Sequence, residues 1–180
     1  FAHIPGLFVV SPATPADAKG LLVAAIRTNN PVLFVESQAL YPTRGVVPPG
    51  EHVVPIGVAN VLRTGRDLTF VGWGPAERLA GEHGLEAEVV DLRSLVPLDI
   101  ETVLASVRRT GRCVVVSQTV LIGSFVNEIV ARIQEAAFDD LDAPVARVGA
   151  ANGISPQAET LERAFLPSVD DIVTVALGLV

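Results

Sequence analysis

The feature that most constrains the fold is a regular alternation of short apolar runs with segments of helical pattern. In its first part, two apolar runs, Leu7–Val10 and Val32–Val35, flank a helix that begins at Pro15. Thr14 can cap this helix, with Pro15 at its first position and Asp17 three residues after the cap. Two strands that are joined by a helix lie parallel in one sheet, with a right-handed crossover. Residues 7–36 therefore predict one strand-helix-strand unit, whose helix carries Ala18, Leu22, Ala25 and Ile26 on one face.

The alternation repeats several times after residue 56. Apolar positions spaced i, i+3, i+4 and i+7 run from Ile100 to Val107 and from Val126 to Ile133, which is typical of helices packed on a core. Asp99 is expected to cap the first of these helices and Gly111 to follow its end, while Ser168 caps the last helix of the chain. The expected strands are 56–62, 68–72, 88–92, 113–116 and 145–148, and the further expected helices are 75–82, 158–165 and 169–179. This order predicts an α/β fold with an open, mostly parallel sheet and helices on both faces.

The segment between these two parts has no lasting periodicity. From Ser37 to Pro55 it contains four prolines and two glycines, so it is interpreted as a linker. The predicted organisation is residues 1–37, a linker at 38–55, and a second domain at 56–180. Because one helix and two strands are too few for a domain, and the chain starts at Phe1 and lacks methionine, we expect it to be part of something longer.

Composition excludes several classes of protein. Of the 180 residues, 49% are hydrophobic and 18% are charged, which is typical of a globular chain and not of a disordered one. No apolar run approaches the roughly 20 residues of a membrane span, and no membrane partner is expected. The net charge is −7 and the basic residues are scattered, so a nucleic-acid surface is not expected either. The single cysteine, Cys113, rules out an internal disulfide and fits a cytoplasmic protein.

Taken alone, the residues do not form a catalytic constellation. The motif "GWGP" and the start "GS" of "GSFVNEI" each lie between a strand and a helix, where either an anion site or simple helix capping is possible. The three histidines, His3, His52 and His83, have no neighbouring ligands at metal-binding spacing. Cys113 lies within an apolar strand and is expected to be a buried hydrophobe, not a nucleophile.

The helix end "AIRTNNP" is the one stretch with a possible site of its own. The last carbonyls of a helix lack intrahelical partners and carry the negative end of its dipole, so they favour a cation. Potassium is well served by such carbonyls with added side-chain oxygens. The alternative is a plain stop, in which Asn29 or Asn30 caps the helix and Pro31 ends it.

Five stretches, in order, give the chain a resemblance to a known family. They are "FAHIPGLFVVSPATPADAKGLLVAAIRTNNPVLFVE", "DLRSLVPLD", "TGRCVVVSQ", "GSFVNEIVARI" and "LDAPVARV". Together they resemble the β subunit of the E1 component of 2-oxo acid dehydrogenases. The resemblance implies that 1–37 is the end of a pyrimidine-binding domain and that 56–180 is a transketolase C-terminal domain.

The family resemblance also implies an activity. E1 enzymes use thiamine diphosphate with Mg²⁺ to decarboxylate a 2-oxo acid and acylate the lipoyl group of E2. The family's catalytic glutamate and histidine precede the segment that matches Phe1, so no catalytic or cofactor-binding residue is assigned in this chain. The family's potassium site does carry over, to the carbonyls of Ala25 and Ile26 and to Thr28 and Asn30, although the family often has Asp where Thr28 stands.

The resemblance implies three protein partners: an E1 α subunit, a second β subunit and the subunit-binding domain of lipoyl-bearing E2. Asp170 and Asp171 could meet that basic domain, or could simply favour the dipole of the last helix. The location implied is the bacterial cytoplasm, or the mitochondrial matrix in a eukaryote. The chain departs from the family at two further places. Ser117 and Gln118 stand where the family commonly has a His-Glu or Glu-Glu pair, and the helix expected after Gly74 is shorter than the family's by roughly two turns. Other open alternatives are a transketolase, a 1-deoxyxylulose-5-phosphate synthase or 2-oxoacid oxidoreductase, and a non-catalytic interaction module.

Overall fold

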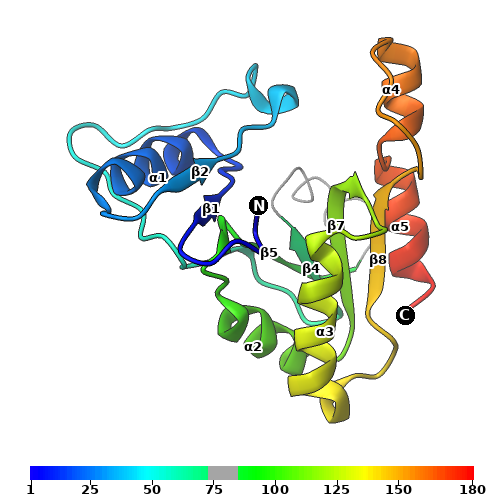
Figure 1. The fold of residues 1–180 in the computed structure, drawn as a ribbon. Helices are drawn as coiled ribbons and strands as arrows, with labels where there is room; N and C mark the ends of the chain where they lie inside the picture. The colour runs from blue at the N-terminus through cyan, green and yellow to red at the C-terminus, as the bar shows by residue number, and fades with distance from the viewer. Residues whose placement is uncertain (73–84) are drawn as a thin grey trace. The chain divides into compact units, whose positions relative to one another are not determined.

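A computed structural model of the chain describes residues 1–72 and 85–180, which divide into two compact units (Figure 1). Unit 1 comprises Phe1–Asn60 together with Asp91–Asp99, and unit 2 comprises Val61–Val90 and Ile100–Val180. The expected helix 75–82, the end of the "GWGP" motif and His83 lie outside the described residues. These units are defined by contacts between residues, whereas the predicted domains are defined by sequence. The predicted boundaries at 1–37, 38–55 and 56–180 therefore stay a prediction.

Unit 1 contains the predicted strand-helix-strand motif. Strand β1 (Phe8–Val10) pairs in parallel with β2 (Val32–Phe34), and helix α1 (Pro15–Arg27) joins them. Thr14 is the N-cap of α1 and accepts a hydrogen bond from the Asp17 amide at 3.1 Å, as the sequence predicts. A third strand, β6 (Ser94–Val96), was not predicted; it pairs antiparallel with β1, so the sheet order is β2-β1-β6.

The apolar stripe that identified α1 lies on its outer side. Leu22 is 48% exposed and Ile26 is 76% exposed. The helix instead buries Gly20 and Leu21, and Leu21 packs with Val10 and Val54. A glycine inside a helix lowers its intrinsic stability, so this one needs a reason in packing. The reason is Val54, whose amide donates to the Gly20 carbonyl at 3.1 Å.

The segment predicted to be a linker is attached to α1 inside unit 1. The segment begins with a 3₁₀ turn, η1 (Gln38–Leu40). Residues 45–54, which we call the strap, then lie along helix α1. The Lys19 ammonium donates to the carbonyls of Pro48 and Gly50, both at 2.7 Å, and Arg27 forms an ion pair with Glu51. The strap is therefore held at several points and is not a free tether.

Unit 2 is built on the predicted open sheet. Its strand order is β3-β5-β4-β7-β8, and both the β4–β7 and the β7–β8 pairs are parallel. The strands are β3 (Asn60–Arg63), β4 (Leu68–Gly72), β5 (Ala87–Asp91), β7 (Cys113–Val120) and β8 (Ala146–Ala150). The expectation of a strand over all of 56–62 was wrong, because Gly57 has φ +85° and its amide donates to a side chain, that of Ser94.

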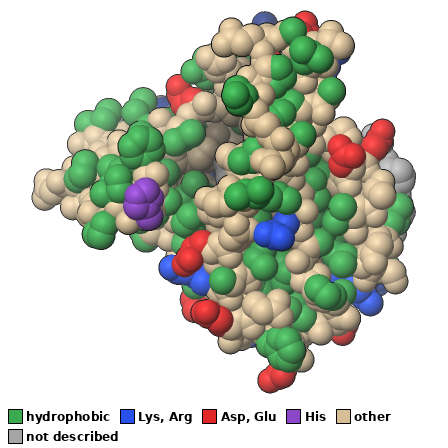
Figure 2. Space-filling model, turned by 45° about the vertical axis from the view of Figure 1, so that its right-hand side comes forward, with side chains coloured by type: hydrophobic (Ala, Val, Ile, Leu, Met, Phe, Trp, Pro, Cys, Tyr) green, Lys and Arg blue, Asp and Glu red, His purple; other side chains and the backbone are tan. Residues whose placement is uncertain are grey.

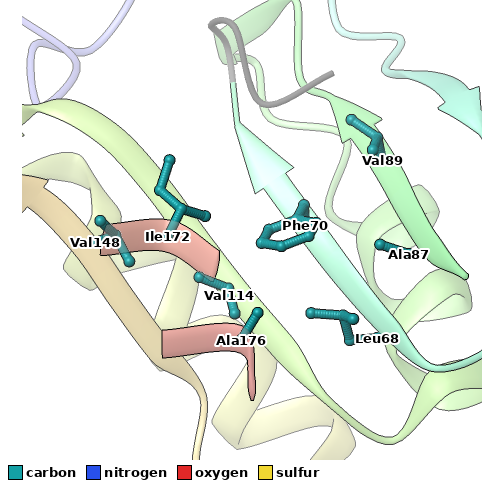
Figure 3. Close-up of a cluster of buried hydrophobic side chains, with 8 residues drawn as sticks. All are labelled: Leu68, Phe70, Ala87, Val89, Val114, Val148, Ile172 and Ala176. Carbon is teal, nitrogen blue, oxygen red and sulfur yellow. The ribbon is translucent and has the colours of Figure 1, made fainter. Parts of the chain in front are cut away.

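Helices cover both faces of this sheet, as predicted. On β4, Leu68 and Phe70 point to the face that is packed by Ile172 and Ala176 of α5 (Figure 3). Thr69, between them, points to the opposite face and hydrogen-bonds Ser106 and Thr110 of α2, both at 2.7 Å. The helices are α2 (Ile100–Thr110), α3 (Phe125–Ala137), followed by the 3₁₀ turn η3 (Phe138–Asp140), α4 (Glu159–Phe165) and α5 (Val169–Leu177).

Two capping predictions for unit 2 are confirmed. Gly111 follows the end of α2 with φ +67°, and its amide donates to the Val107 carbonyl at 2.8 Å. Ser168 and Asp171 form a capping box at the start of α5. Among the described residues, no helix is long and apolar enough to cross a membrane.

Candidate functional site

The C-terminal end of α1 is the place where the sequence predicted a cation site. The helix ends at Arg27, and Thr28 follows with extended backbone, φ −79° and ψ 150°. The Thr28 amide donates to the Ala24 carbonyl at 3.1 Å, which closes the last turn. The Asn30 amide makes a long contact of 3.4 Å with the Thr28 hydroxyl oxygen. The chain thus turns away from the helix axis directly after Arg27, without a left-handed residue at Thr28.

The oxygen atoms at this turn are of the kinds that bind a weakly hydrated cation. Within the described residues, no backbone amide donates to the carbonyls of Ala25 and Ile26, which belong to the set that a helix end leaves without internal partners. The Thr28 hydroxyl keeps a lone pair, and the Asn30 side chain is exposed. Neutral oxygens of these kinds are the ligands that potassium takes in proteins. The four predicted residues therefore offer a donor set without a charge.

The charges around this helix end are already paired. The Arg27 guanidinium, which could otherwise lie over the terminal carbonyls, is bound by Glu51 of the strap. This interaction lowers the pKa of Glu51, mainly through its hydrogen bond with Arg27. No group of three or more His, Cys, Asp or Glu side chains able to hold a metal occurs in the part of the chain that the structure describes. Residues 1–72 and 85–180 therefore provide no carboxylate-rich site for a divalent ion.

The other sequence candidates have structural uses. Ser124 caps α3 by accepting from the Val126 amide at 3.1 Å, so this helix start supports the capping interpretation. Ser117 accepts from the Thr119 amide at 3.1 Å, at an irregularity of the β7–β8 pairing. Cys113 is fully buried, and burial raises the pKa of its thiol to about 12. A thiol in this state is not a nucleophile at neutral pH.

Asp170 and Asp171, the predicted E2 contacts, have different surroundings. The Asp171 carboxylate accepts from both the amide and the hydroxyl of Ser168, at 2.8 and 2.7 Å. Those hydrogen bonds lower the pKa of Asp171. Asp170 is exposed in the first turn of α5, and there its backbone carbonyl accepts from Thr174. Asp171 therefore serves first as a helix cap, whereas the carboxylate of Asp170 faces solvent.

A pocket that the sequence analysis missed lies in unit 1, where β1 and β2 end and α1 begins. Its volume is about 200 Å³, and it is lined in part by Thr14, Ala18, Glu36, Leu40 and Tyr41. The Tyr41 hydroxyl donates to Glu36 at 3.2 Å, and this hydrogen bond raises the pKa of Tyr41. Parallel strands open such a crevice at their carboxyl ends, so the predicted strand order could have indicated it.

The charged side chains show no field of a single sign on the face seen in Figure 2. Acidic and basic groups are interspersed there among hydrophobic ones. This face therefore has the mixed charge that the scattered basic residues of the sequence lead us to expect.

Two domain models match the chain. Residues 57–172 match the transketolase C-terminal domain, and residues 1–44 match the transketolase pyrimidine-binding domain. Among solved structures, an inactive β4 tetramer of a split-gene transketolase has a TM-score of 0.75 and 26% identity, over 99% of this chain and 58% of that one.

Several curated relatives are more similar in sequence. The acetoin:2,6-dichlorophenolindophenol oxidoreductase subunit beta of Cupriavidus necator is 43% identical over 98% of this chain and 54% of its own. The pyruvate dehydrogenase E1 component subunit beta of Rhizobium meliloti is 44% identical over 96% of this chain and 39% of its own. The 2-oxoisovalerate dehydrogenase subunit beta of Bacillus subtilis is 41% identical over 96% of this chain and 55% of its own. The chain thus spans about half the length of most of these relatives.

Proposed function

Because this chain belongs to the transketolase C-terminal domain family, we propose that it is part of the β subunit of an E1 enzyme. With an α subunit, that enzyme decarboxylates a 2-oxo acid and passes the acyl group to the lipoyl group of E2. The observation that carries the proposal is the similarity to E1 β subunits, three of which are 41 to 44% identical over at least 96% of the chain. The split-gene transketolase is less similar, at 26% identity.

In this proposal the chain has an architectural role. Thiamine diphosphate, when bound, supplies the electron sink for decarboxylation. The described residues include no carboxylate cluster that would hold its Mg²⁺. We therefore assign the cofactor to the α subunit and to parts of the β subunit outside this chain, and we expect the chain alone to be inactive.

The proposal includes one ion held by this chain, a potassium ion at the C-terminal end of α1. Its ligands would be the carbonyls of Ala25 and Ile26, with oxygens of Thr28 and Asn30. Two observations support this assignment: in residues 1–72 and 85–180 no backbone amide donates to these two carbonyls, and Arg27 is paired with Glu51. Thr28 brings no negative charge, so we expect weak binding that needs millimolar potassium.

A melting experiment tests the ion separately from the activity. The thermal unfolding of the full chain is followed in KCl and in NaCl at equal ionic strength. Wild type should melt higher in KCl, Thr28→Asp should enlarge the difference through its added charge, and Asn30→Ala should reduce it. Equal melting in the two salts for wild type and Thr28→Asp would reject the site.

The partners that we propose are the α subunit, a second β subunit and the subunit-binding domain of E2. The related split-gene transketolase forms a β4 tetramer, which supports contact between β subunits. For E2, Asp170 is the better candidate of the predicted pair, because its carboxylate is not the one engaged in the helix cap. We further propose a cytoplasmic location, or the mitochondrial matrix in a eukaryote, since one relative is named as mitochondrial.

Reconstitution tests the function itself. The polypeptide that carries this chain is co-expressed with its α subunit, and thiamine diphosphate-dependent reduction of 2,6-dichlorophenolindophenol is measured with pyruvate, 2-oxoisovalerate and acetoin. Activity with at least one of these substrates is expected. Ketol transfer from a sugar phosphate, with no activity on the three substrates, would instead identify a transketolase.

A further inference from the structure

The motif "DLRSLVPLD", residues 91–99, belongs to unit 1 by its contacts, although residues of unit 2 flank it in the chain. We call this segment the clasp. Its central residues form β6, whose partner is β1. The Ser11 amide, just after β1, donates to the Arg93 carbonyl at 2.8 Å. The backbone of the clasp thus completes the small sheet of unit 1.

The side chains of the clasp bind the chain that leaves unit 1. Ser94 accepts from the Gly57 amide at 2.9 Å, and Asp99 accepts from the Ala59 amide at 2.9 Å. Asp91 accepts from the Arg93 amide at 3.0 Å, which fixes the turn before β6. These polar residues of the motif therefore each have a specific acceptor role inside unit 1.

Arg93 joins the clasp to the start of α1. Its guanidinium lies 2.5 Å from Asp17 Oδ1, and the other oxygen of Asp17 accepts from the Thr14 hydroxyl at 2.7 Å. The Asp17 side chain is 3% exposed and that of Arg93 is 17% exposed. A buried ion pair depends strongly on both partners, because removal of one leaves the other charge buried and unpaired.

Arg93 holds this position against two local penalties. Its φ is +56°, the left-handed region that disfavours residues with a Cβ. Its Nε is buried without a hydrogen-bond partner in the described part of the chain. The ion pair with Asp17 offsets these penalties, together with the hydrogen bonds of the Arg93 amide and carbonyl. Such an outlier in a buried contact is a reason to look for a specific role.

We propose that the clasp is a conformational device that docks and undocks as one unit, and that the Asp17–Arg93 pair is its lock. When the pair is intact, β6 stays on β1 and the amides of Gly57 and Ala59 stay bonded. When the pair is broken, the clasp opens and exposes these amides, while the sheet of unit 2 stays folded. One ion pair thereby couples the start of α1, at Thr14, to residues 57–59, where the chain leaves unit 1.

Native-state hydrogen exchange by NMR on the full chain tests this device. In Arg93→Met and in Asp17→Asn, the amides of Ser11, Gly57 and Ala59 should exchange at least about 100-fold faster, equivalent to about 2.7 kcal/mol at 1.36 kcal/mol per tenfold. The Val114 and Val115 amides of β7 should not change. The double variant should be little worse than either single one, because each already removes the same pair.

Two further variants separate the lock from general damage. Arg93→Gly relieves the positive φ but removes the guanidinium, so it should open the clasp as Arg93→Met does. Arg132→Met removes an exposed ion pair with Glu128 on α3. It should leave the exchange rates of the Ser11, Gly57 and Ala59 amides unchanged.

The proposal fails under either of two results. If the amides of Ser11, Gly57 and Ala59 exchange at the wild-type rate in both Arg93→Met and Asp17→Asn, the ion pair does not hold the clasp in place. Equal acceleration of the Val35 amide, which bonds β1 from the side of β2, would show that unit 1 opens as a whole and that the clasp is not a separate unit. If the lock variants do not fold, Ser94→Ala gives the milder test. It should accelerate the Gly57 and Ser11 amides together, by about tenfold, because the clasp opens as one unit, and acceleration of Gly57 alone or of neither amide would reject the proposal.

Discussion

The substitution Gly20→Ala should destabilise unit 1, although alanine is the better helix former. A Cβ built at Gly20 would lie 2.5 Å from Val54 Cγ2 and 2.9 Å from the Val54 amide nitrogen. Val54 cannot simply move away, because its amide donates to the Gly20 carbonyl and its side chain packs on Leu21. The strap would have to shift away from the helix.

The magnitudes decide the sign of the effect. Replacing glycine by alanine inside a helix gains about 1 kcal/mol. Overpacking typically costs about 1–3 kcal/mol, and loss of the Val54 hydrogen bond adds about 1 kcal/mol. We therefore expect a net loss of about 1–3 kcal/mol, which lowers the melting temperature of a chain of this size by roughly 5 °C.

Thermal melting by circular dichroism measures this loss, and hydrogen exchange of residues 45–54 locates it. Ala24→Gly, in the same helix, measures the propensity contribution on its own. Val54→Ala removes the nearest clashing atom, so Gly20→Ala should cost less in that background. A gain in stability for Gly20→Ala would refute the reasoning, because it would mean that the strap does not pack on the helix.

Three further expectations follow from buried or capped groups. Cys113, with its thiol pKa raised to about 12 by burial, should resist a thiol reagent at pH 8 until urea unfolds the chain; labelling at the rate of a free thiol would contradict its burial. The Ser168 hydrogen bonds lower the pKa of Asp171 from its ordinary value of 3.8. Asp171 should therefore stabilise α5 fully at pH values above 3.8, and this stabilisation should be lost as the pH falls through the lowered pKa of the folded state. Asp171→Asn should therefore flatten the acid dependence of α5 fraying in hydrogen exchange. Arg109→Met should destabilise unit 2 by about 1–3 kcal/mol in urea denaturation, since it leaves the fully buried Glu88 without its cation, although Arg109 itself is half exposed. The matched change Arg66→Met, at an exposed pair, should have an effect below about 1 kcal/mol.

The elements that the sequence predicted are those whose signals are local. Thr14, Gly111 and Ser168 act on residues within one turn of themselves, so their roles could be predicted without tertiary information. Strand β6 has only three residues, and its partner β1 is distant in the chain, so no local pattern marks it. The strap has the pattern of a linker because proline and glycine suppress periodicity, while its attachment depends on the absent side chain of Gly20 and on Lys19.

The candidate ion site shows the same division between local and distant information. The end of a helix at "TNNP" and its free carbonyls follow from the sequence, and the four ligands follow from the family resemblance. The pairing of Arg27 with Glu51 could not be predicted, because Glu51 belongs to the strap. The ligand set itself stays a prediction until potassium is titrated.

Helix α1 connects these observations, because separate contacts fix it along its length. Asp17 is held near its start by Arg93, and Gly20 is held in its middle by Val54. A site of neutral carbonyls has no net charge to draw a cation in, so its affinity depends on oxygens that are already placed before binding. Contacts that fix α1 therefore contribute to the proposed potassium site without touching the ion. It follows that Gly20→Ala should reduce the difference in melting temperature between KCl and NaCl as well as lowering both values. An unchanged difference would mean that the helix end keeps its geometry independently of the strap.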